Sequence, residues 1–294
     1  MSAAPVIDYL RQLESQGQTH VNIDDEARLI LREFYLRARG GAGQRAAPVI
    51  RAAAPQESPV VELPSMPVAE SADVAESAPQ LVATGATAAE KIMSLKQQVA
   101  SWGPIRELDS LRQTMVFSMG NPEADVMLVG EAPGYDEERL GEPFVGKAGQ
   151  KLDGILKAMG LSRRDVYMTS VVKYRPSMPN QTTNNRKPTR QEMDACMPFV
   201  HEEVKVVAPR VIIVLGVTPA QALLGGEGTV ESLRGEFHRF EGVPVRVTYH
   251  PSYILHNEET AEKRKLWEDM LNVMDMLEMA VSEKQRGYFL SKPS

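Results

Sequence analysis

Four short apolar runs, separated by stretches with helical spacing, constrain the fold of this chain more than any other feature of its sequence. The runs cover residues 126–129, 166–172, 211–215 and 243–249, and each is rich in Val. Strands that are apolar along their whole length are typical of parallel sheets covered on both faces. We therefore predict an α/β fold, a three-layer α/β/α sandwich with a short, mostly parallel central sheet.

Composition divides the 294-residue chain into four parts. Residues 1–38 show helical spacing of apolar residues and predict an N-terminal helical segment. Residues 39–87 are rich in Ala, Pro and Ser with almost no aromatic residues, which predicts a disordered linker. A globular domain is predicted over 88–280, followed by a C-terminal tail over 281–294. The apolar face of the N-terminal helices needs burial, so we expect it to contact a protein partner, another copy or the body.

Charge and cysteine content exclude several classes of function. The net charge is −6 at pH 7, so no global basic field draws the chain to nucleic acid or membranes, and any DNA contact needs a local basic patch. The single cysteine, Cys196, excludes an internal disulfide and a metal or cluster site made of cysteines alone. The first residues lack the pattern of a signal peptide, and no apolar run reaches membrane-spanning length. We expect a cytoplasmic monomer with no metal site.

Two of the apolar runs end in residues that can form a site. The first run leads into Gly-Glu-Ala-Pro-Gly at 130–134, and the last leads into His250, which is followed by Pro and Ser. Open α/β folds bind their ligands at the carboxyl edge of the sheet. Glu131 and His250 are therefore predicted to meet at that edge, beside backbone N–H groups of the glycine-rich turn.

Five segments follow one another in an order that is found in a known family. They are the residues at 130–138, 141–150, 171–176, 185–189 and 249–253. Together with Val-Leu-Gly at 214–216, they resemble the motifs of the family 4 uracil-DNA glycosylases. The resemblance covers about residues 92–277 without rearrangement. It implies that 88–280 is a uracil-DNA glycosylase-like domain.

The resemblance implies a monofunctional DNA repair enzyme that flips uracil out of DNA and hydrolyses its N-glycosidic bond. Such an enzyme must stabilise negative charge on the leaving base and positive charge on the sugar. His250 can donate a hydrogen bond to the base, and Glu131 or Glu137 can face the sugar or hold the attacking water. The family gives catalytic roles to these three positions. The base-binding residues implied are Ala132, Phe144, which can stack on the base, and Ser170.

The family holds an iron–sulfur cluster with four cysteines, and this chain departs from that pattern. The first pair of cysteines would fall between Trp102 and Ile105, the third is Tyr174, and only the fourth, Cys196, is present. One thiolate cannot hold such a cluster, so we expect no iron–sulfur cluster and no other cofactor. Trp102, Ile105 and Tyr174 are expected to form an apolar plug, with Cys196 as a small buried side chain.

A second departure lies at Ser170, where the family has an asparagine whose amide reads the edge of uracil. A hydroxyl can make only part of that hydrogen-bond pattern. Losing a base-reading contact costs about 1–3 kcal/mol of discrimination. The serine therefore predicts weaker uracil excision or a changed base preference.

Contact with DNA is predicted for a basic cluster and for residues near the closing motif. Lys173, Arg175 and Arg186 are expected to bind phosphates, and Ser252 to contact DNA beside them. Leu255 is placed to wedge into the duplex where the base leaves. The leading interpretation is a glycosylase acting on uracil, or a related deaminated base, in DNA. Two alternatives are a non-catalytic or weakly catalytic uracil- or DNA-binding protein and a base-modifying enzyme on the same fold.

Overall fold

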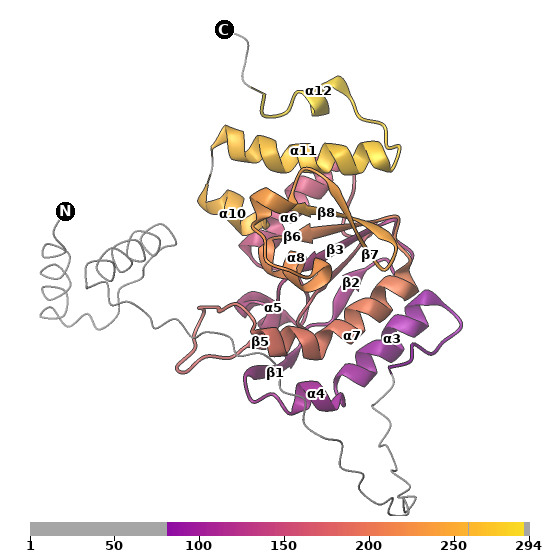
Figure 1. Cartoon of the computed structure of the whole chain (residues 1–294), viewed down its shortest axis with the longest axis vertical. Helices are drawn as coiled ribbons and strands as arrows, with labels where there is room; N and C mark the ends of the chain where they lie inside the picture. Colours follow the sequence, from indigo (N-terminus) through magenta and orange to yellow (C-terminus); the bar gives the residue numbers. More distant parts are fainter. Residues whose placement is uncertain (1–80, 258, 291–294) are drawn as a thin grey trace, which may run out of the picture. The chain divides into compact units, whose positions relative to one another are not determined.

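The fold is built around a six-stranded sheet, and the computed structural model describes residues 81–257 and 259–290 of the chain (Figure 1). The predicted helical segment 1–38 and most of the predicted linker lie outside the described residues. The strands lie in the order β2-β4-β3-β6-β8-β7. Their bounds are β2 Ser118–Gly120, β3 Val126–Gly130, β4 Val166–Ser170, β6 Val211–Leu215, β7 Phe237–Phe240 and β8 Val243–Thr248.

The four inner strands of the sheet are parallel, and the two edge strands are antiparallel to their neighbours. β3 pairs with β4 and β6, and β6 pairs with β8, all in parallel. β2 and β7 pair antiparallel with β4 and β8. Every residue of β3, β4 and β6 is buried, which explains why these sequences are apolar without alternation. The predicted mostly parallel sheet is confirmed.

Helices cover both faces of this sheet (Figure 1). Along β3, Met127 and Val129 belong to one core and Val126 and Leu128 to the other, because successive side chains of a strand point to opposite faces. The predicted three-layer α/β/α sandwich is confirmed. The first layer contains α3 Ala88–Val99, α4 Gly103–Arg106, α7 Arg190–Val207 and α8 Val217–Leu224, and the second contains α6 Lys147–Met159, α10 Pro251–His256 and α11 Thr260–Met276.

The remaining elements are short. The strands β1 Leu111–Met115 and β5 Tyr174–Pro176 form a separate antiparallel pair, and the helices are α5 Tyr135–Leu140, α9 Val230–Leu233 and α12 Glu283–Arg286. The strand predicted over 166–172 ends earlier, at Ser170. Beyond it, the N–H groups of Val171 and Val172 donate to the carbonyl oxygens of Gly130 and Glu131. These bonds tie the end of β4 to the first residues of the predicted site.

The folded body is wider than the predicted domain over 88–280. At its start, the Gln98 side chain of α3 binds both the N–H and the carbonyl oxygen of Val82. At its end, the indole N–H of Trp267 donates to the Gln285 carbonyl oxygen over 2.6 Å. The Tyr288 ring also packs on Trp267, with 5.3 Å between ring centroids. None of the helices in these described ranges combines the length and apolar character needed to cross a lipid bilayer.

Candidate active site

A cleft of about 420 Å³ lies at the carboxyl ends of the parallel strands. The chain reaches it from the turn after β3, from the loop before α7, from the start of α8, and from the end of β8. Of the predicted site residues, the structure brings Glu131, Ala132, Arg186, His250 and Ser252 together in its walls. The side chains that the sequence analysis did not predict for this cleft include Asn185, Thr218, Val230, Tyr249 and Tyr253.

His250 is held as a neutral hydrogen-bond donor. It is the N-cap of α10, and the Ser252 backbone N–H donates to its Nδ1 over 3.2 Å. The Ser252 hydroxyl also lies 2.7 Å from Nδ1. Because a backbone N–H can only donate, Nδ1 must accept, and the ring hydrogen is on Nε2. Burial lowers the pKa of the imidazole to about 4, so the ring is uncharged at neutral pH.

Glu131 is far from His250 in the sequence, but both residues line the same cleft. Burial raises the pKa of its carboxyl group, while the Thr218 side chain and the charge of Lys187 act in the opposite direction. Thr218 is itself buried, in the first turn of α8. A partly desolvated carboxylate of this kind suits a base that orients water or faces a developing cation. The Thr218 hydrogen bond and the Lys187 charge favour the charged form but do not cancel the effect of burial.

Glu137 acts as a clamp on its own loop. One carboxylate oxygen accepts from the N–H groups of Val145 and Gly146, each over 3.0 Å, and the other accepts from Gly134 over 3.1 Å. Both oxygens are therefore occupied by backbone donors. We assign Glu137 a positioning role in place of the sugar-facing role predicted from the sequence. Its negative charge still reaches His250, where it opposes the lowering of the pKa.

Phe144 and Ser170 lie together beside Gly130, next to the cleft residues but outside the set that lines its open part. A Cβ on Gly130 would stand 2.7 Å from the Phe144 ring and 3.4 Å from the Ser170 hydroxyl. Phe144 has a φ of 56°, in the left-handed region, and a Cβ on Gly149 would collide with its carbonyl oxygen. Two glycines thus allow the ring to pack over the end of β3. Ser170 is buried at the adjoining end of β4.

The part of the chain that forms this cleft is similar to known proteins. Residues 117–271 match the model of the uracil DNA glycosylase superfamily. The chain belongs to that superfamily. It is 40% identical to the type-4 uracil-DNA glycosylase of Pyrobaculum aerophilum over 156 residues, covering 50% of this chain and 76% of the relative. It is 37% identical to the Thermotoga maritima type-4 enzyme (54% and 81% covered) and 32% identical to the Sulfurisphaera tokodaii one (68% and 91% covered).

Lys173, predicted to bind phosphate, is buried in the structure, so this prediction is wrong. Its ammonium group lies 2.5 Å from Glu203 and also donates to the Thr169 hydroxyl and the Ser170 carbonyl oxygen. Neither side chain of this ion pair is exposed. An uncompensated buried charge is costly, and the pair avoids that cost. Lys173 therefore supports the end of β4 from beneath Ser170.

Arg175 is also buried and is unavailable to DNA. Its guanidinium group donates to Glu138 of α5, to the Asn185 side chain, and to the carbonyl oxygens of Thr182 and Asn184. The side chain is 2% exposed, which corrects the prediction of a phosphate contact. Arg175 instead fastens the loop that carries Asn185 into the cleft.

Arg186 borders the cleft, but its guanidinium group is committed to protein partners. It forms a two-pronged ion pair with Glu192 and donates to the carbonyl oxygens of Ser110 and Ser177. The hydrogen bonds from Arg186 hold the pKa of the Glu192 carboxyl group below its usual value, despite burial. These bonds give Arg186 a structural role, and because its side chain is still 24% exposed at the cleft, the phosphate contact stays a prediction. Its neighbour Lys187 is an exposed cation at the same cleft.

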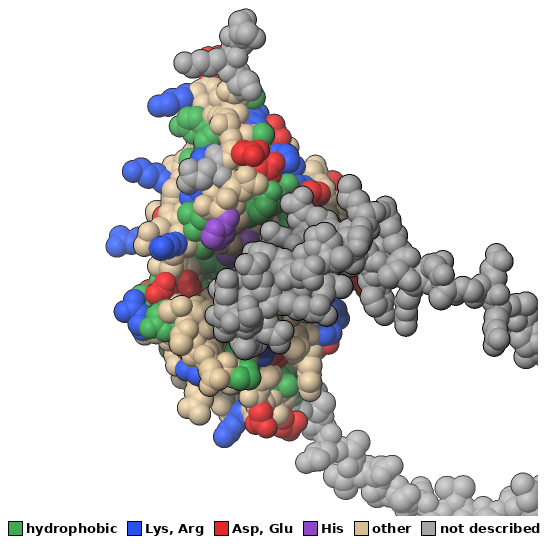
Figure 2. Space-filling model, turned by 90° about the vertical axis from the view of Figure 1, so that its left-hand side faces the viewer, with side chains coloured by type: hydrophobic (Ala, Val, Ile, Leu, Met, Phe, Trp, Pro, Cys, Tyr) green, Lys and Arg blue, Asp and Glu red, His purple; other side chains and the backbone are tan. Residues whose placement is uncertain are grey.

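Two of the predicted DNA contacts, Ser252 and Leu255, lie near the closing motif. Ser252 lines the cleft, where its hydroxyl and backbone hold His250. Leu255 is partly exposed on α10, and its wedge role stays a prediction. On the face shown in Figure 2, histidine and hydrophobic side chains lie next to each other, and Lys and Arg side chains project along one edge.

The residues at the family's cluster positions do not fit an iron–sulfur cluster. The Trp102 ring packs edge-on against Phe199, with 5.4 Å between centroids, and Ile105 is buried in the same core. Cys196 is fully buried, and desolvation raises the pKa of its thiol to about 11. Cluster iron is held by cysteine thiolates, and three of the four cluster positions have no thiol. In the described ranges, no three His, Cys, Asp or Glu side chains are grouped to hold a metal ion.

We expect the purified protein to be colourless and to contain less iron than one atom per chain, because only one sulfur donor is available. Metal analysis and the visible absorption spectrum check this result. Cys196→Ala should leave uracil excision within about twofold of the wild-type rate, since the thiol contacts neither the cleft nor a metal. Stoichiometric iron, for example in a cluster bridging two chains, would contradict the prediction.

Proposed function

We propose that this protein hydrolyses the N-glycosidic bond of uracil in DNA, leaving an abasic site and the free base. The observation that carries the proposal is the pairing of a neutral His250, with its hydrogen on Nε2, and the desolvated carboxyl group of Glu131 in one cleft. The names of the type-4 relatives support the same reaction.

The chemistry follows from the charges that develop as the bond breaks. The electron pair of the C1′–N1 bond goes to the base, whose oxygen becomes negative, and the sugar becomes positive. A neutral imidazole N–H can stabilise the base oxygen without prior proton transfer. Glu131 can stabilise the cation and accept the proton of the water that adds to C1′. Phe144 packs at the end of β3, where it can offer a ring face to the flipped base.

A uracil-containing oligonucleotide tests this proposal directly. The purified protein is incubated with single-stranded and duplex forms and then treated with alkali, which breaks the strand at abasic sites. Strand breaks at the uracil position, with release of free uracil, support the hydrolysis. A gel shift without breaks would instead favour a binding protein without turnover, the candidate that Ser170 favours. A modified base in an unbroken strand would favour a base-modifying enzyme.

Several finer features belong to the same proposal. We propose that the enzyme is a cytoplasmic monomer and that it acts without a cofactor. We also propose that the N-terminal segment 1–38 binds a protein partner. The single cysteine and the absence of fitting cluster ligands support the cofactor-free activity. A related deaminated base is the other substrate that Ser170 allows, because a hydroxyl can donate or accept.

Restoring an amide at position 170 should raise uracil excision. We expect Ser170→Asn to increase kcat/KM for uracil by about tenfold, because an amide supplies a donor and an acceptor in one plane and a base contact contributes about 1–3 kcal/mol. Single-turnover kinetics on a uracil oligonucleotide measures the change. Ser170→Ala is the matched control and should not increase the rate. Loss of a strong native activity in Ser170→Asn would show that the serine is matched to another base.

A further inference from the structure

The cleft extends past His250 into an aromatic end. Tyr249 and Tyr253, which flank the histidine in sequence, both line it together with Val230 of α9. Tyr253 is 36% exposed, whereas Tyr249 is buried. The proposed reaction assigns no role to either tyrosine. This end of the cleft therefore requires a separate explanation.

The exposed ring of Tyr253 is the outer layer of a stack that begins in the core. Its centroid lies 4.6 Å from that of Tyr249, and the two rings are within 12° of parallel. The guanidinium group of Arg234 lies over the Tyr249 ring at 5.4 Å. Arg234 is in turn paired over 3.1 Å with Asp269, a fully buried carboxylate that also binds Arg246. The stack is thus anchored to a buried ion-pair network.

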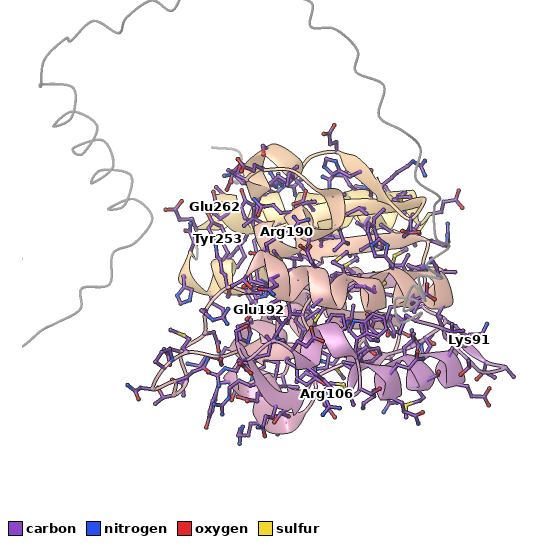
Figure 3. All side chains as sticks on the ribbon, turned by 60° about the horizontal axis from the view of Figure 1, so that its bottom comes forward. Lys91, Arg106, Arg190, Glu192, Tyr253 and Glu262 are labelled. Atoms are coloured by element: carbon purple, nitrogen blue, oxygen red, sulfur yellow. The ribbon has the colours of Figure 1, made fainter. Side chains whose placement is uncertain are left out.

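Hydrogen bonds at the hydroxyl group fix the rotation of the Tyr253 ring. The hydroxyl donates to Glu262 of α11 over 3.1 Å and accepts from the Asn257 amide over 3.2 Å. Glu262 is itself held by Lys265 over 2.6 Å. Figure 3 shows Tyr253 and Glu262 next to each other at the edge of the molecule. An exposed side chain normally loses rotational entropy on binding, and this ring has lost most of it already.

We propose that the outer face of Tyr253 is a stacking platform for an unpaired nucleobase adjacent to the flipped nucleotide, so that the protein engages single-stranded DNA through this ring. The inference rests on the proposed function, which places the flipped base in the same cleft. A flat aromatic face accepts any base, because every base has a π face. The DNA strand that carries the flipped base must leave the cleft at its rim, where Tyr253 lies.

A preference for single-stranded over duplex DNA follows from the same geometry. In a duplex, the neighbouring base is paired and stacked on the next pair, and it can reach Tyr253 only after those contacts are broken. In a single strand it can stack without that cost. Removing a base-stacking side chain typically weakens binding by about tenfold or more. The effect of removing the ring should therefore be larger for single-stranded than for duplex substrates.

The test combines kinetics with a fluorescent base. Tyr253→Ala should raise KM for single-stranded uracil DNA about tenfold and KM for the duplex much less. 2-Aminopurine is placed on either side of a non-hydrolysable 2′-fluorouridine. Its fluorescence should be quenched by the wild-type protein and by Tyr253→Phe, which keeps the ring, and not by Tyr253→Ala or Tyr253→Leu. Phe289→Ala, which removes another exposed aromatic side chain far along the chain, should behave as wild type.

The outcomes separate the platform from the reaction itself. If the wild-type protein excises uracil but Tyr253→Ala and Tyr253→Leu quench 2-aminopurine as it does, the platform is refuted while the function stands. Equal losses on single strands and duplexes would also refute it. If the wild-type protein excises no uracil from either substrate, the proposed function fails. Quenching that depends on the Tyr253 ring would then still establish the stacking site.

Discussion

Replacing His250 by alanine is expected to lower the rate of uracil excision by about 100-fold to 1000-fold, the range measured when one donor to a developing oxyanion is removed. The structure fixes the hydrogen on Nε2, because Ser252 supplies the donors to Nδ1. The loss should fall on kcat, with little change in KM, since the base oxygen becomes negative only as the bond breaks. Single-turnover kinetics on a uracil oligonucleotide measures it.

Two controls make this result specific. His201→Ala removes a half-exposed histidine paired with Glu241 and should leave the rate unchanged. Nitrogen NMR of labelled histidine should show His250 with Nδ1 unprotonated at neutral pH and a titration midpoint of about 4. A His250→Ala enzyme with a near wild-type rate, or an imidazolium at pH 7, would contradict the assigned role.

Glu137→Gln should cost about 100-fold in kcat, although the residue touches no substrate in this assignment. An amide has one acceptor oxygen, so the N–H of Gly134, or those of Val145 and Gly146, would face an NH₂ group. The loop between Gly134 and Phe144 would then shift, and a displacement of about 1 Å can reduce a rate about 100-fold. Excision kinetics and urea unfolding together report the effect. The unpaired donors should also lower the free energy of unfolding by about 1–3 kcal/mol.

Glu142→Gln provides the matched control, because this exposed carboxylate lies on the same loop. It should leave both the rate and the stability unchanged. Glu137→Asp, whose shorter side chain keeps both oxygens, should recover part of the lost rate. If Glu137→Gln reduced stability but not kcat, the clamp would be structural only, and the positioning role would be withdrawn.

The sequence predicted the layers of the fold because the signals for them are local. Continuous apolar runs marked β3 and β6, in which every residue is buried. The edge strand β7 was not predicted, since only its last residue is buried. The order of motifs also placed Glu131 and His250 at one edge of the sheet, where the structure has them.

Side-chain roles that depend on distant partners could not be predicted in this way. The basic residues Lys173 and Arg175 looked like phosphate ligands, but Glu203 and Glu138 neutralise them inside the protein. Glu203 lies on α7 and Glu138 on α5, and counting charges along the sequence does not reveal these ion pairs. The close approach of the Phe144 carbonyl oxygen likewise requires Gly149, in the first turn of α6, because a Cβ there would collide with it. Thr218 gave a weak signal, because it follows the glycine at the end of β6.

The two helix layers are completed at different moments of synthesis. The layer of α3, α7 and α8 is encoded before residue 225, whereas the opposite layer waits for α10, α11 and the segment that covers Trp267. β8, which delivers His250, also comes late in the sequence and lies between β6 and β7 in the sheet. A nascent chain that has reached residue 225 therefore carries Glu131 and Phe144 but not β8, which brings His250 to the cleft. The two residues of the proposed pair, Glu131 and His250, can meet only after β8 has been synthesised.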